Sequence, residues 1–518
     1  NDAVTRQLNA LQAVADVEWG LNSTRLLSSS TGPYVGMRAR VQPFRYFWES
    51  REGMVDAFIR ESGAYRNAVE GGAAPEAALA LLRKNREFIT ALRTEKTRLQ
   101  SGFVAMDPGT GQIKAWVGSR DFQTDQFDHV ARAQRQPGSI FKPFVYGAAL
   151  AQGMSPDRQY IDRAVAIPLG RGEFWRPTDG GAPSGRPMTA GEGLMYSKNT
   201  ITAQIMQEVT PRKTADLARK MGVRDSKLDP VYALALGTSP VTALEMVAAY
   251  GTIANGGEYR KPVLVTRIAN KSGKVLATFE ADAERALSAD AAESLLDMLR
   301  GVIDHGTGQA IRTRFGIQAD VAGKTGTTQN NTDGWFMLMH PQLVVGSWVG
   351  FNDARVTMRS NYWGQGAHNA LSVVGDFFRQ TLNRRLIDAS VRFEDQRTGL
   401  RPMINQLDKW LDWLGRQKPH TPLPAPVPAL PPVRELSEPA TTEAEQDRIM
   451  EQAWEEEQNR ERSQRRPVPE SYEERGDWRR EDRREDRRDE PIDARSWLRG
   501  RNDRSPSQYD TPWPDPVR

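Results

Sequence analysis

The chain has 518 residues, of which 38% are hydrophobic, and its formal net charge is +4. This length allows about two or three domains with a sizeable buried core, and the small net charge does not favour a nucleic-acid-binding protein. Because the sequence contains no cysteine, disulfides, thiolate–zinc sites, iron–sulfur clusters and cysteine nucleophiles are excluded.

The first hundred residues are predicted to form a helical connector. Apolar residues recur at helical spacing at Val4, Leu8 and Leu11, and a second helical pattern follows Pro75, a residue compatible with a first turn. The serine-rich stretch 22–36 is expected to form a loop between them. No catalytic motif is recognisable in this region, so we interpret residues 1–100 as a scaffold.

Two hairpins are predicted, far apart in the chain. Four runs have the pattern of strands and are separated in pairs by turn residues: 102–107 with 112–119, and 333–340 with 342–351. Between the two pairs, the segments 188–208 and 242–254 have the spacing of helices. This order predicts an α+β fold for residues 101–396, in which an antiparallel sheet is flanked by helices.

The composition changes after residue 396. Of the 32 prolines in the chain, 15 lie in its last 100 residues. We predict that residues 397–518 form a Pro-rich and charged, largely disordered tail, because such a segment buries too little apolar surface to offset the entropy of ordering. Within it, residues 419–432 are expected to be an extended spacer and residues 443–466 an exposed, salt-bridged helix.

Ser139 and Lys142 form the only S-x-x-K motif of the chain. Pro143 fits only in the first turn of the apolar helix that follows, so Ser139 is expected at the helix N-terminus with Lys142 on the same face. The helix dipole favours negative charge that develops beside the serine. A lysine in an apolar pocket loses its proton more readily. The pair is therefore a candidate nucleophile and base.

Two further short motifs contain candidate functional residues. Ser197-Lys198-Asn199 is an S-x-N sequence, which in isolation a surface loop explains equally well. Lys324-Thr325-Gly326 follows a strand-like run at 321–323, and Asp333 begins the next strand. Lysine and threonine side chains are therefore expected to alternate along an edge strand, where Gly326 permits close approach of a ligand.

In this order, S-x-x-K, S-x-N and K-T-G resemble the three motifs of the active-serine penicillin-recognising enzymes. Longer segments are similar to the transpeptidase domain of class A (bifunctional) penicillin-binding proteins: 135–150, 195–205, 235–257, 323–336 and 344–353. The resemblance covers about residues 100–385 and implies the fold shared by these transpeptidases and the β-lactamases.

The sequence departs from this family at three places. Ile140 stands where a small polar residue is usual, Asp128-His129 where an Asn-Arg pair is common, and Asp179 where a W-x-P-x-N segment ends in asparagine. We expect these differences to alter substrate fit without touching the catalytic residues. The glutamate-centred glycosyltransferase motifs of the bifunctional family are not found, so the glycosyltransferase domain is expected to be absent from this chain.

The resemblance implies a D,D-transpeptidase that cross-links peptidoglycan stem peptides. Ser139 would attack the D-Ala–D-Ala carbonyl and form an acyl-enzyme, and Lys142 would take the hydroxyl proton. Ser197 would relay a proton to the leaving amine, while Asn199 would hold the substrate amide and the lysine. The backbone N–H groups of Ser139 and Thr327 would form the oxyanion hole.

The K-T-G segment would bind the donor peptide. Lys324 would bind the terminal carboxylate and help to keep Lys142 neutral. The other substrate-binding residues that we expect are Thr325, Gly326, Thr327, Thr328 and Trp335. β-Lactams would mimic the donor and be trapped at the acyl stage. The resemblance implies neither a cofactor nor a metal.

The sequence leaves three alternatives to a transpeptidase to weigh. A D,D-carboxypeptidase or β-lactamase on the same fold would need a base that activates water for deacylation. A catalytically silent sensor of cell-wall peptides is disfavoured by the intact catalytic set. A Ser–His–Asp hydrolase is disfavoured because the chain has no G-x-S-x-G, and its five histidines are interpreted as surface or structural residues.

The implied substrate places the protein in the cell envelope, at the periplasmic face of the cytoplasmic membrane. The sequence shows no signal peptide and no apolar run of about 18 residues. We therefore expect the chain to be the C-terminal part of a longer bifunctional enzyme whose membrane anchor lies outside it. The expected partners are donor and acceptor stem peptides, β-lactams, and cell-wall-synthesis proteins that bind the tail, but no nucleic acid.

Overall fold

The computed structural model describes residues 1–23 and 25–397. By its contacts the chain divides into one unit of residues Asn1–Pro419 and another of residues His420–Arg518. The second unit lies outside the described residues, as do the predicted tail beyond residue 397, its spacer and its charged helix.

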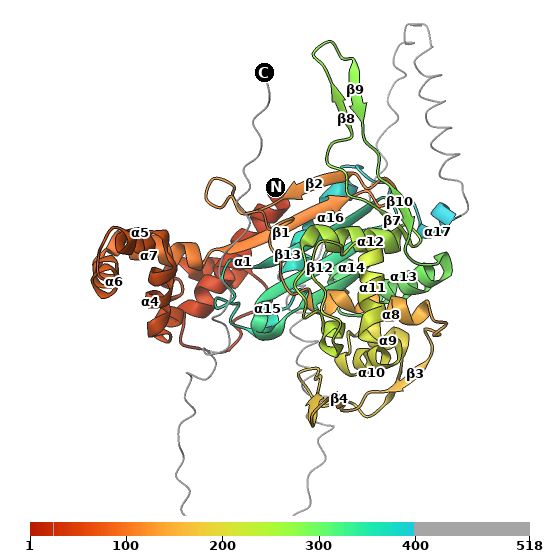
Figure 1. Ribbon diagram of the computed structural model, residues 1–518, viewed down its shortest axis with the longest axis horizontal. Coiled ribbons are helices and arrows are strands. Elements are labelled where there is room, and N and C mark those ends of the chain that lie inside the picture. Colours follow the sequence, from red (N-terminus) through yellow and green to blue (C-terminus); the bar gives the residue numbers. More distant parts are fainter. Residues whose placement is uncertain (24, 398–518) are drawn as a thin grey trace, which may run out of the picture. The chain divides into compact units, whose positions relative to one another are not determined.

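A five-stranded antiparallel sheet forms the centre of the described unit (Figure 1). Its strands lie in the order β11 (Ala322–Thr327), β12 (Asp333–His340), β13 (Leu343–Phe351), β1 (Leu99–Met106) and β2 (Ile113–Val117). The pairs β12–β13 and β1–β2 are the two predicted hairpins, and they join because β1 pairs with β13. The predicted α+β class and both hairpins are confirmed. β11, which carries the K-T-G motif, is an edge strand, as predicted.

Both faces of this sheet are buried, and alternate residues of each strand enter different cores. On β12, Met337 and Met339 belong to one hydrophobic cluster, whereas Phe336 and Leu338 belong to the other. Successive side chains of a strand point to opposite faces, so two apolar faces require two covering layers. Every residue of β1, β12 and β13 is buried.

Helices cover each face of the sheet. The first cluster joins it to α8 (Lys142–Leu150), α12 (Ala243–Ala254) and α13 (Ala289–Asp304), and the second to α1 (Asp2–Gly20) and α16 (Ala370–Asn383). The remaining helices between residues 100 and 397 are η2 (Gly138–Phe141), α9 (Ala190–Met195), α10 (Asn199–Val209), α11 (Pro211–Met221), η3 (Tyr232–Leu236), α14 (Ala310–Thr313), η4 (Gln329–Asn331), α15 (Asn361–Gly364) and α17 (Phe393–Arg397). The described residues also contain four small two-stranded sheets: β3 (Gln159–Ile161) with β6 (Pro187–Thr189), β4 (Ile167–Gly170) with β5 (Glu173–Trp175), β7 (Glu258–Arg260) with β10 (Ala283–Arg285), and β8 (Arg267–Ala269) with β9 (Val275–Thr278).

The first 98 residues are helical, as predicted. After α1 they form α2 (Gly32–Met37), η1 (Arg38–Arg40), α3 (Arg45–Glu49), α4 (Glu52–Glu61), α5 (Gly63–Glu70), α6 (Pro75–Lys84) and α7 (Arg86–Lys96). α1 packs on α16 and β1, so this helix shares the hydrophobic cluster of the sheet. Within the described residues, no helix combines the length and the apolarity that a membrane span requires.

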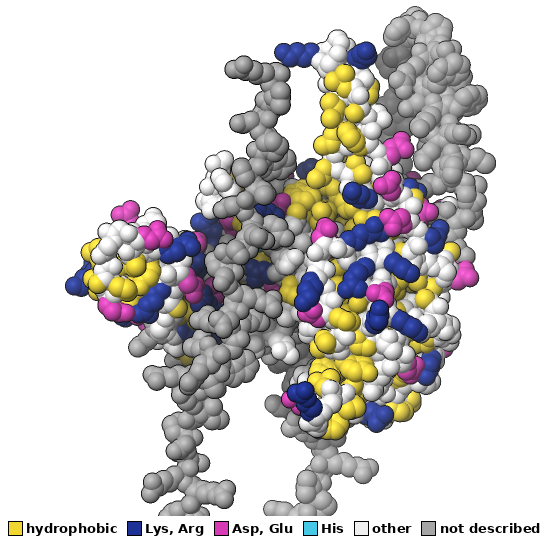
Figure 2. All heavy atoms as spheres, viewed as in Figure 1, with side chains coloured by type: hydrophobic (Ala, Val, Ile, Leu, Met, Phe, Trp, Pro, Cys, Tyr) yellow, Lys and Arg dark blue, Asp and Glu magenta, His cyan; other side chains and the backbone are white. Residues whose placement is uncertain are grey.

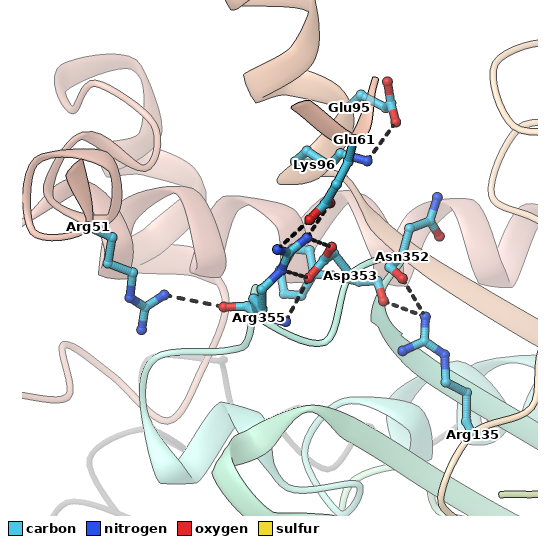
Figure 3. A network of polar contacts seen from close by, with 9 residues as sticks. Arg51, Glu61, Glu95, Lys96, Arg135, Asn352, Asp353 and Arg355 are labelled. Atoms are coloured by element: carbon cyan, nitrogen blue, oxygen red, sulfur yellow. Dashed lines mark hydrogen bonds and ion pairs between the residues drawn. The ribbon is translucent and has the colours of Figure 1, made fainter. Parts of the chain in front are cut away.

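An arginine in the loop that follows β13 joins the sheet to these N-terminal helices (Figure 3). The Arg355 guanidinium donates to both carboxylate oxygens of Glu61 on α4, at 2.8 and 2.6 Å, and also to Asp353. Two carboxylates raise the pKa of Arg355 above its ordinary value. Arg135, from the segment before Ser139, donates to the carbonyl oxygens of Phe351 and Asn352, where β13 ends. The end of β13 is therefore tied both to α4 and to the segment that leads to Ser139.

Two local predictions were wrong. The expected loop 22–36 is shorter, because α2 begins at Gly32. The expected helix 188–208 is interrupted between α9 and α10, where Ser197 has a positive φ of 58°. A positive φ cannot continue a right-handed helix, so the chain turns at the S-x-N motif.

The β8–β9 ribbon extends away from the sheet (Figure 1). Figure 2 shows apolar side chains along its length and basic side chains at its tip. The exposed apolar residues of this segment are Leu264, Val265, Ile268, Val275, Leu276 and Phe279.

Candidate active site

Ser139 lies where the chain enters a buried helix. It belongs to the 3-10 turn η2, which continues directly into α8, and Pro143 lies in the first turn of α8. Every residue of α8 is buried. The Tyr250 hydroxyl of α12 donates to the carbonyl oxygen of Ile140 at 2.8 Å, and this hydrogen bond anchors the turn to α12. The predicted helix start at Ser139 is confirmed.

Gly138 lets the serine segment lie directly against β11. Its φ is +57°, and a Cβ at this position would lie 2.5 Å from the carbonyl oxygen of Thr327 and 3.3 Å from the Thr327 nitrogen. A larger residue would be both strained and in collision with the strand. The backbone of Thr327 therefore lies next to the backbone that leads into Ser139.

Lys142 is fully buried and directed at the S-x-N motif. Its Nζ donates to the Asn199 Oδ1 at 2.6 Å, to the Ser197 hydroxyl at 3.2 Å and to the Ser197 carbonyl oxygen. Burial lowers the pKa of Lys142 to about 7, with a smaller opposing effect from Asp179 and a smaller reinforcing effect from Lys198. The amine of Lys142 is therefore available in its neutral form near neutral pH.

The S-x-N motif occupies the turn between α9 and α10. The N–H groups of Ser197 and Lys198 donate to Leu194 and Gly193 and close α9. Asn199 is the first residue of α10. The left-handed conformation of Ser197 brings its hydroxyl and the Asn199 side chain to the same side, toward Lys142.

Lys324 reaches the same serine hydroxyl from the sheet. Its Nζ donates to the Ser197 Oγ at 2.9 Å and to the Thr325 carbonyl oxygen at 3.3 Å. The residue is fully buried, and burial together with the charge of Lys142 holds its pKa well below the ordinary value of a lysine. The Ser197 hydroxyl thus lies between two amines whose protonation states depend on each other.

The three threonines of the K-T-G segment have different surroundings. Thr325 is buried, and a 2.7 Å hydrogen bond joins its hydroxyl to that of Thr307. The Thr327 hydroxyl is half-buried and accepts the N–H of Gly366 at 3.1 Å. Thr328 donates to Asp333 at 3.1 Å. Of the three, Thr327 is the residue whose backbone lies beside Gly138.

Gly326 and Trp335 pack against the serine segment. A Cβ on Gly326 would lie 2.7 Å from the Pro137 carbonyl oxygen and 2.9 Å from the Ile140 side chain. The close approach that Gly326 permits is therefore made by Pro137 and Ile140 of the protein itself. Trp335 is 1% exposed, and its indole N–H donates to the Gln136 carbonyl oxygen at 2.8 Å. Both residues support the turn that carries Ser139.

A buried carboxylate that the sequence analysis missed anchors the S-x-N turn. Asp162 accepts hydrogen bonds from the Ser184 backbone and hydroxyl, from the Thr200 hydroxyl at 2.7 Å and from the Lys198 Nζ at 3.2 Å. Burial would raise its pKa, but these donors together hold it below the ordinary value of an aspartate. Asp162 belongs to no recognisable motif, and its contacts with Lys198 and Thr200 reveal its role.

Asp179 contradicts the expectation that the family departures leave the catalytic set untouched. Its Oδ1 accepts the backbone N–H of Asn199 at 2.5 Å, and the neighbouring Thr178 carbonyl oxygen accepts the Asn199 side-chain amide at 2.6 Å. Asp179 lies 20 residues before Asn199 in sequence but contacts it in space.

The Asp128-His129 departure has a structural role. His129 is buried, stacks on Trp348 with ring centroids 5.1 Å apart, and lies 3.4 Å from the Asp125 carboxylate. Burial lowers its pKa, so the imidazole stays neutral at pH 7. Among residues 1–23 and 25–397 no group of three or more histidine, aspartate or glutamate side chains is placed to hold a metal ion.

Comparisons with known proteins agree on one family. Residues 101–382 match the family model of the penicillin binding protein transpeptidase domain. The chain is 34% identical over 285 residues to penicillin-binding protein 1A of Rickettsia bellii, and 32% identical over 274 residues to penicillin-binding protein 1A of Neisseria gonorrhoeae. These matches cover 50% and 51% of this chain but 36% and 34% of the relatives. The chain therefore spans about a third of the length of these curated relatives.

A solved structure supports the fold. The crystal structure of penicillin-binding protein 1A from Haemophilus influenzae is similar with a TM-score of 0.51 and 26% identity, over 55% of this chain and 48% of that chain.

Proposed function

Because the chain belongs to the penicillin-binding protein transpeptidase family, we propose that it is a peptidoglycan D,D-transpeptidase. Ser139 attacks the carbonyl carbon of a D-Ala–D-Ala bond, an ester forms on the serine oxygen, and the terminal D-Ala leaves as an amine. An amine of a neighbouring stem peptide then attacks the ester, frees Ser139 and forms the cross-link. The observation that carries this proposal is the Ser197 hydroxyl, held by both Lys142 and Lys324.

Lys142 serves as the base for Ser139. An ammonium group donates three hydrogen bonds, which matches the three oxygen acceptors around its Nζ. When Lys142 loses its proton, one of these donations ends and a lone pair becomes available. Ser139 lies one helical turn earlier on the same face, so its hydroxyl proton can move to this lone pair as the serine oxygen attacks.

Ser197 relays a proton to the leaving amine. Its hydroxyl accepts from the lysines and keeps its own proton to donate. When this proton moves to the amine nitrogen as the peptide bond breaks, Lys142 returns its acquired proton to Ser197. The terminal D-Ala thus leaves with the proton of Ser197, which a proton from Lys142 replaces, so the net loss is one proton from Ser139 and the residues recover their starting charges.

The K-T-G edge strand binds the donor. The backbone N–H groups of Ser139 and Thr327 form the oxyanion hole, since the two backbones lie side by side at Gly138. The ammonium of Lys324 and the hydroxyls of Thr325 and Thr327 attract the terminal carboxylate, and Asn199 holds the substrate amide. The same positions accept a β-lactam, whose ring carbonyl replaces the peptide carbonyl.

We further propose that the enzyme acts at the periplasmic face of the cytoplasmic membrane, where its peptide substrates are found, as part of a bifunctional cell-wall synthase. Support comes from the penicillin-binding protein 1A relatives, which extend well beyond the matched region. Cell-wall-synthesis proteins that bind the tail would complete this assembly. Fractionation of cells and detection of the protein in the membrane fraction would test the location.

Transfer and hydrolysis can be separated by their products. The protein is incubated with a synthetic peptide ending in D-Ala–D-Ala, with and without an added D-amino acid as acceptor, and the products are identified by mass spectrometry. We expect the amine-transfer product to accumulate, and we expect Ser139→Ala to form none. A product formed only by hydrolysis would support a D,D-carboxypeptidase, and no product from the unsubstituted protein would support a silent peptide sensor.

A further inference from the structure

The side chain of Asn199 is held in one orientation by a turn outside the three motifs. Its amide nitrogen donates to the Thr178 carbonyl oxygen at 2.6 Å. Its amide oxygen accepts from the Lys142 Nζ at 2.6 Å. Because an amide has its donor and its acceptor on opposite arms, the bond to Thr178 decides that oxygen, and not nitrogen, faces the lysine.

The backbone of Asn199 is held by the next residue of that turn. The Asp179 Oδ1 accepts the Asn199 N–H at 2.5 Å, and its Oδ2 lies 3.4 Å from the Thr200 hydroxyl. The Thr200 hydroxyl donates its single proton over a shorter distance, 2.7 Å, to Asp162. The stronger hydrogen bond of Asp179 is therefore the one that it accepts from the Asn199 N–H.

We propose that Asp179 is a positioning residue for the reaction of Ser139, which fixes Asn199 against Lys142 and places a negative charge beside the base. The proposal rests on the proposed function, because it concerns the lysine that takes the serine proton. Asp179 does not reach Ser139 through any hydrogen bond in the described part of the chain, so it acts through Asn199 and through its charge.

Several charged groups face Lys142, and they act in opposite directions. Lys324 on β11 and Lys198 before α10 favour the neutral amine, whereas Asp179 favours the ammonium form. Lys198 is itself paired with the buried Asp162 at 3.2 Å. Tyr146, one turn further along α8, remains neutral because burial raises the pKa of its hydroxyl. Asp179 thus opposes the two lysines.

The sign of the effect on the rate follows from the role of Lys142. Acylation needs the neutral amine, so its rate rises as the pH passes the pKa of Lys142. Removal of the negative charge of Asp179 lowers that pKa, and the rising limb then moves to lower pH. Asp179 is exposed, so solvent and salt screen its charge and limit the size of the shift.

The test measures the acylation rate with a fluorescent penicillin from pH 5 to 10 in three variants of the full chain. Asp179→Asn keeps a side-chain oxygen for the Asn199 N–H and removes only the charge. Asp179→Ala removes both. Glu173→Gln removes one negative charge from an exposed position of β5 and is the matched control.

For Asp179→Asn we expect the rising limb of the acylation rate to shift to lower pH by about half a pH unit. The rate on the plateau should be nearly unchanged, and the shift should be smaller at high salt. For Asp179→Ala we expect a similar shift and a plateau lowered by about fivefold, because the Asn199 N–H loses its acceptor. Glu173→Gln should follow the unsubstituted protein.

Superimposable pH profiles for Asp179→Asn and Glu173→Gln would overturn the proposal. So would complete loss of acylation in Asp179→Asn while the folded state persists by circular dichroism, because Asp179 would then act on the substrate itself. Failure of the unsubstituted protein to react with the penicillin would instead contradict the proposed function, so the two failures are distinguishable.

Discussion

The side-chain nitrogen of Lys324 lies 2.9 Å from the hydroxyl oxygen of Ser197, although 127 positions separate the two residues in sequence. Lys142 reaches the same hydroxyl at 3.2 Å. Two buried ammonium groups around one oxygen would repel each other strongly, so a proton on one lysine lowers the pKa of the other. Proton movement through Ser197 therefore depends on both lysines together.

Replacement of Lys142 should remove the base and leave the fold intact. For Lys142→Met we expect the penicillin acylation rate to fall by about 10²- to 10⁴-fold, the usual contribution of a positioned general base. Lys142→Arg should fail equally, because a guanidinium does not lose its proton at these pH values. Stopped-flow or gel labelling gives the rates, and a thermal melt checks folding. A Lys142→Met protein that is acylated at an undiminished rate would exclude Lys142 as the base.

The acylation rate should rise with pH around neutrality. Burial lowers the pKa of Lys142 to about 7, so the neutral fraction grows as the pH passes this value. We expect a rising limb between about pH 6 and 8 that levels off above it. A rate that first rises near the ordinary pKa of a lysine would show that Lys142 stays protonated across this interval, and a rate that stays flat would show that Lys142 does not titrate there; either result would contradict the prediction.

The same lowered pKa makes the stability depend on pH. Between about pH 7 and 10 the unfolded chain holds a proton on Lys142 that the folded chain has lost. Because the unfolded state binds more protons in this window, the free energy of unfolding should rise with pH there, and this gain should be absent below pH 7. Denaturant titrations at pH 7 and 9 measure the rise, and Lys142→Met should show a smaller one. An equal rise in both proteins would contradict the assignment.

Gly138 should be intolerant of any side chain. Gly138→Ala combines a positive φ with a 2.5 Å contact to the Thr327 carbonyl oxygen, and we expect about 3–5 kcal/mol of destabilisation or loss of acylation. Gly273→Ala is the matched control, because Gly273 also has a positive φ but no atom within 4 Å of the added Cβ. Its cost should be about 1 kcal/mol, with normal acylation. Equal effects of the two substitutions would mean that the backbone of Thr327 on β11 does not restrict the space at Gly138.

The motif residues could be predicted from the sequence because their spacing is local. Ser139 and Lys142 lie one turn apart on a helix whose start Pro143 indicates, and β11 follows from the run that enters Lys324. The turn at Ser197 could not be predicted in this way. Apolar residues such as Leu194 and Ile201 continue across it at a spacing compatible with a helix, and no glycine or proline lies between these two residues to indicate the break.

Contacts between segments that are distant in the chain could not be predicted from the sequence for a different reason. The anchoring of Asn199 by Asp179 and of Lys198 by Asp162 depends on how a loop returns to α10, which the spacing of residues does not encode. In the same way, the helical pattern of α1 shows that one face is apolar but not that β1 and α16 cover it.

The central claim is that Ser139 is the residue that becomes acylated. The protein is treated with a penicillin, digested, and analysed by peptide mass spectrometry over several hours, with Ser139→Ala as the control. We predict one penicilloyl adduct on the peptide that contains Ser139, persistent over hours, and none in the Ser139→Ala protein. An adduct on another residue, or no adduct on a folded protein, would contradict the assignment of Ser139 as the nucleophile.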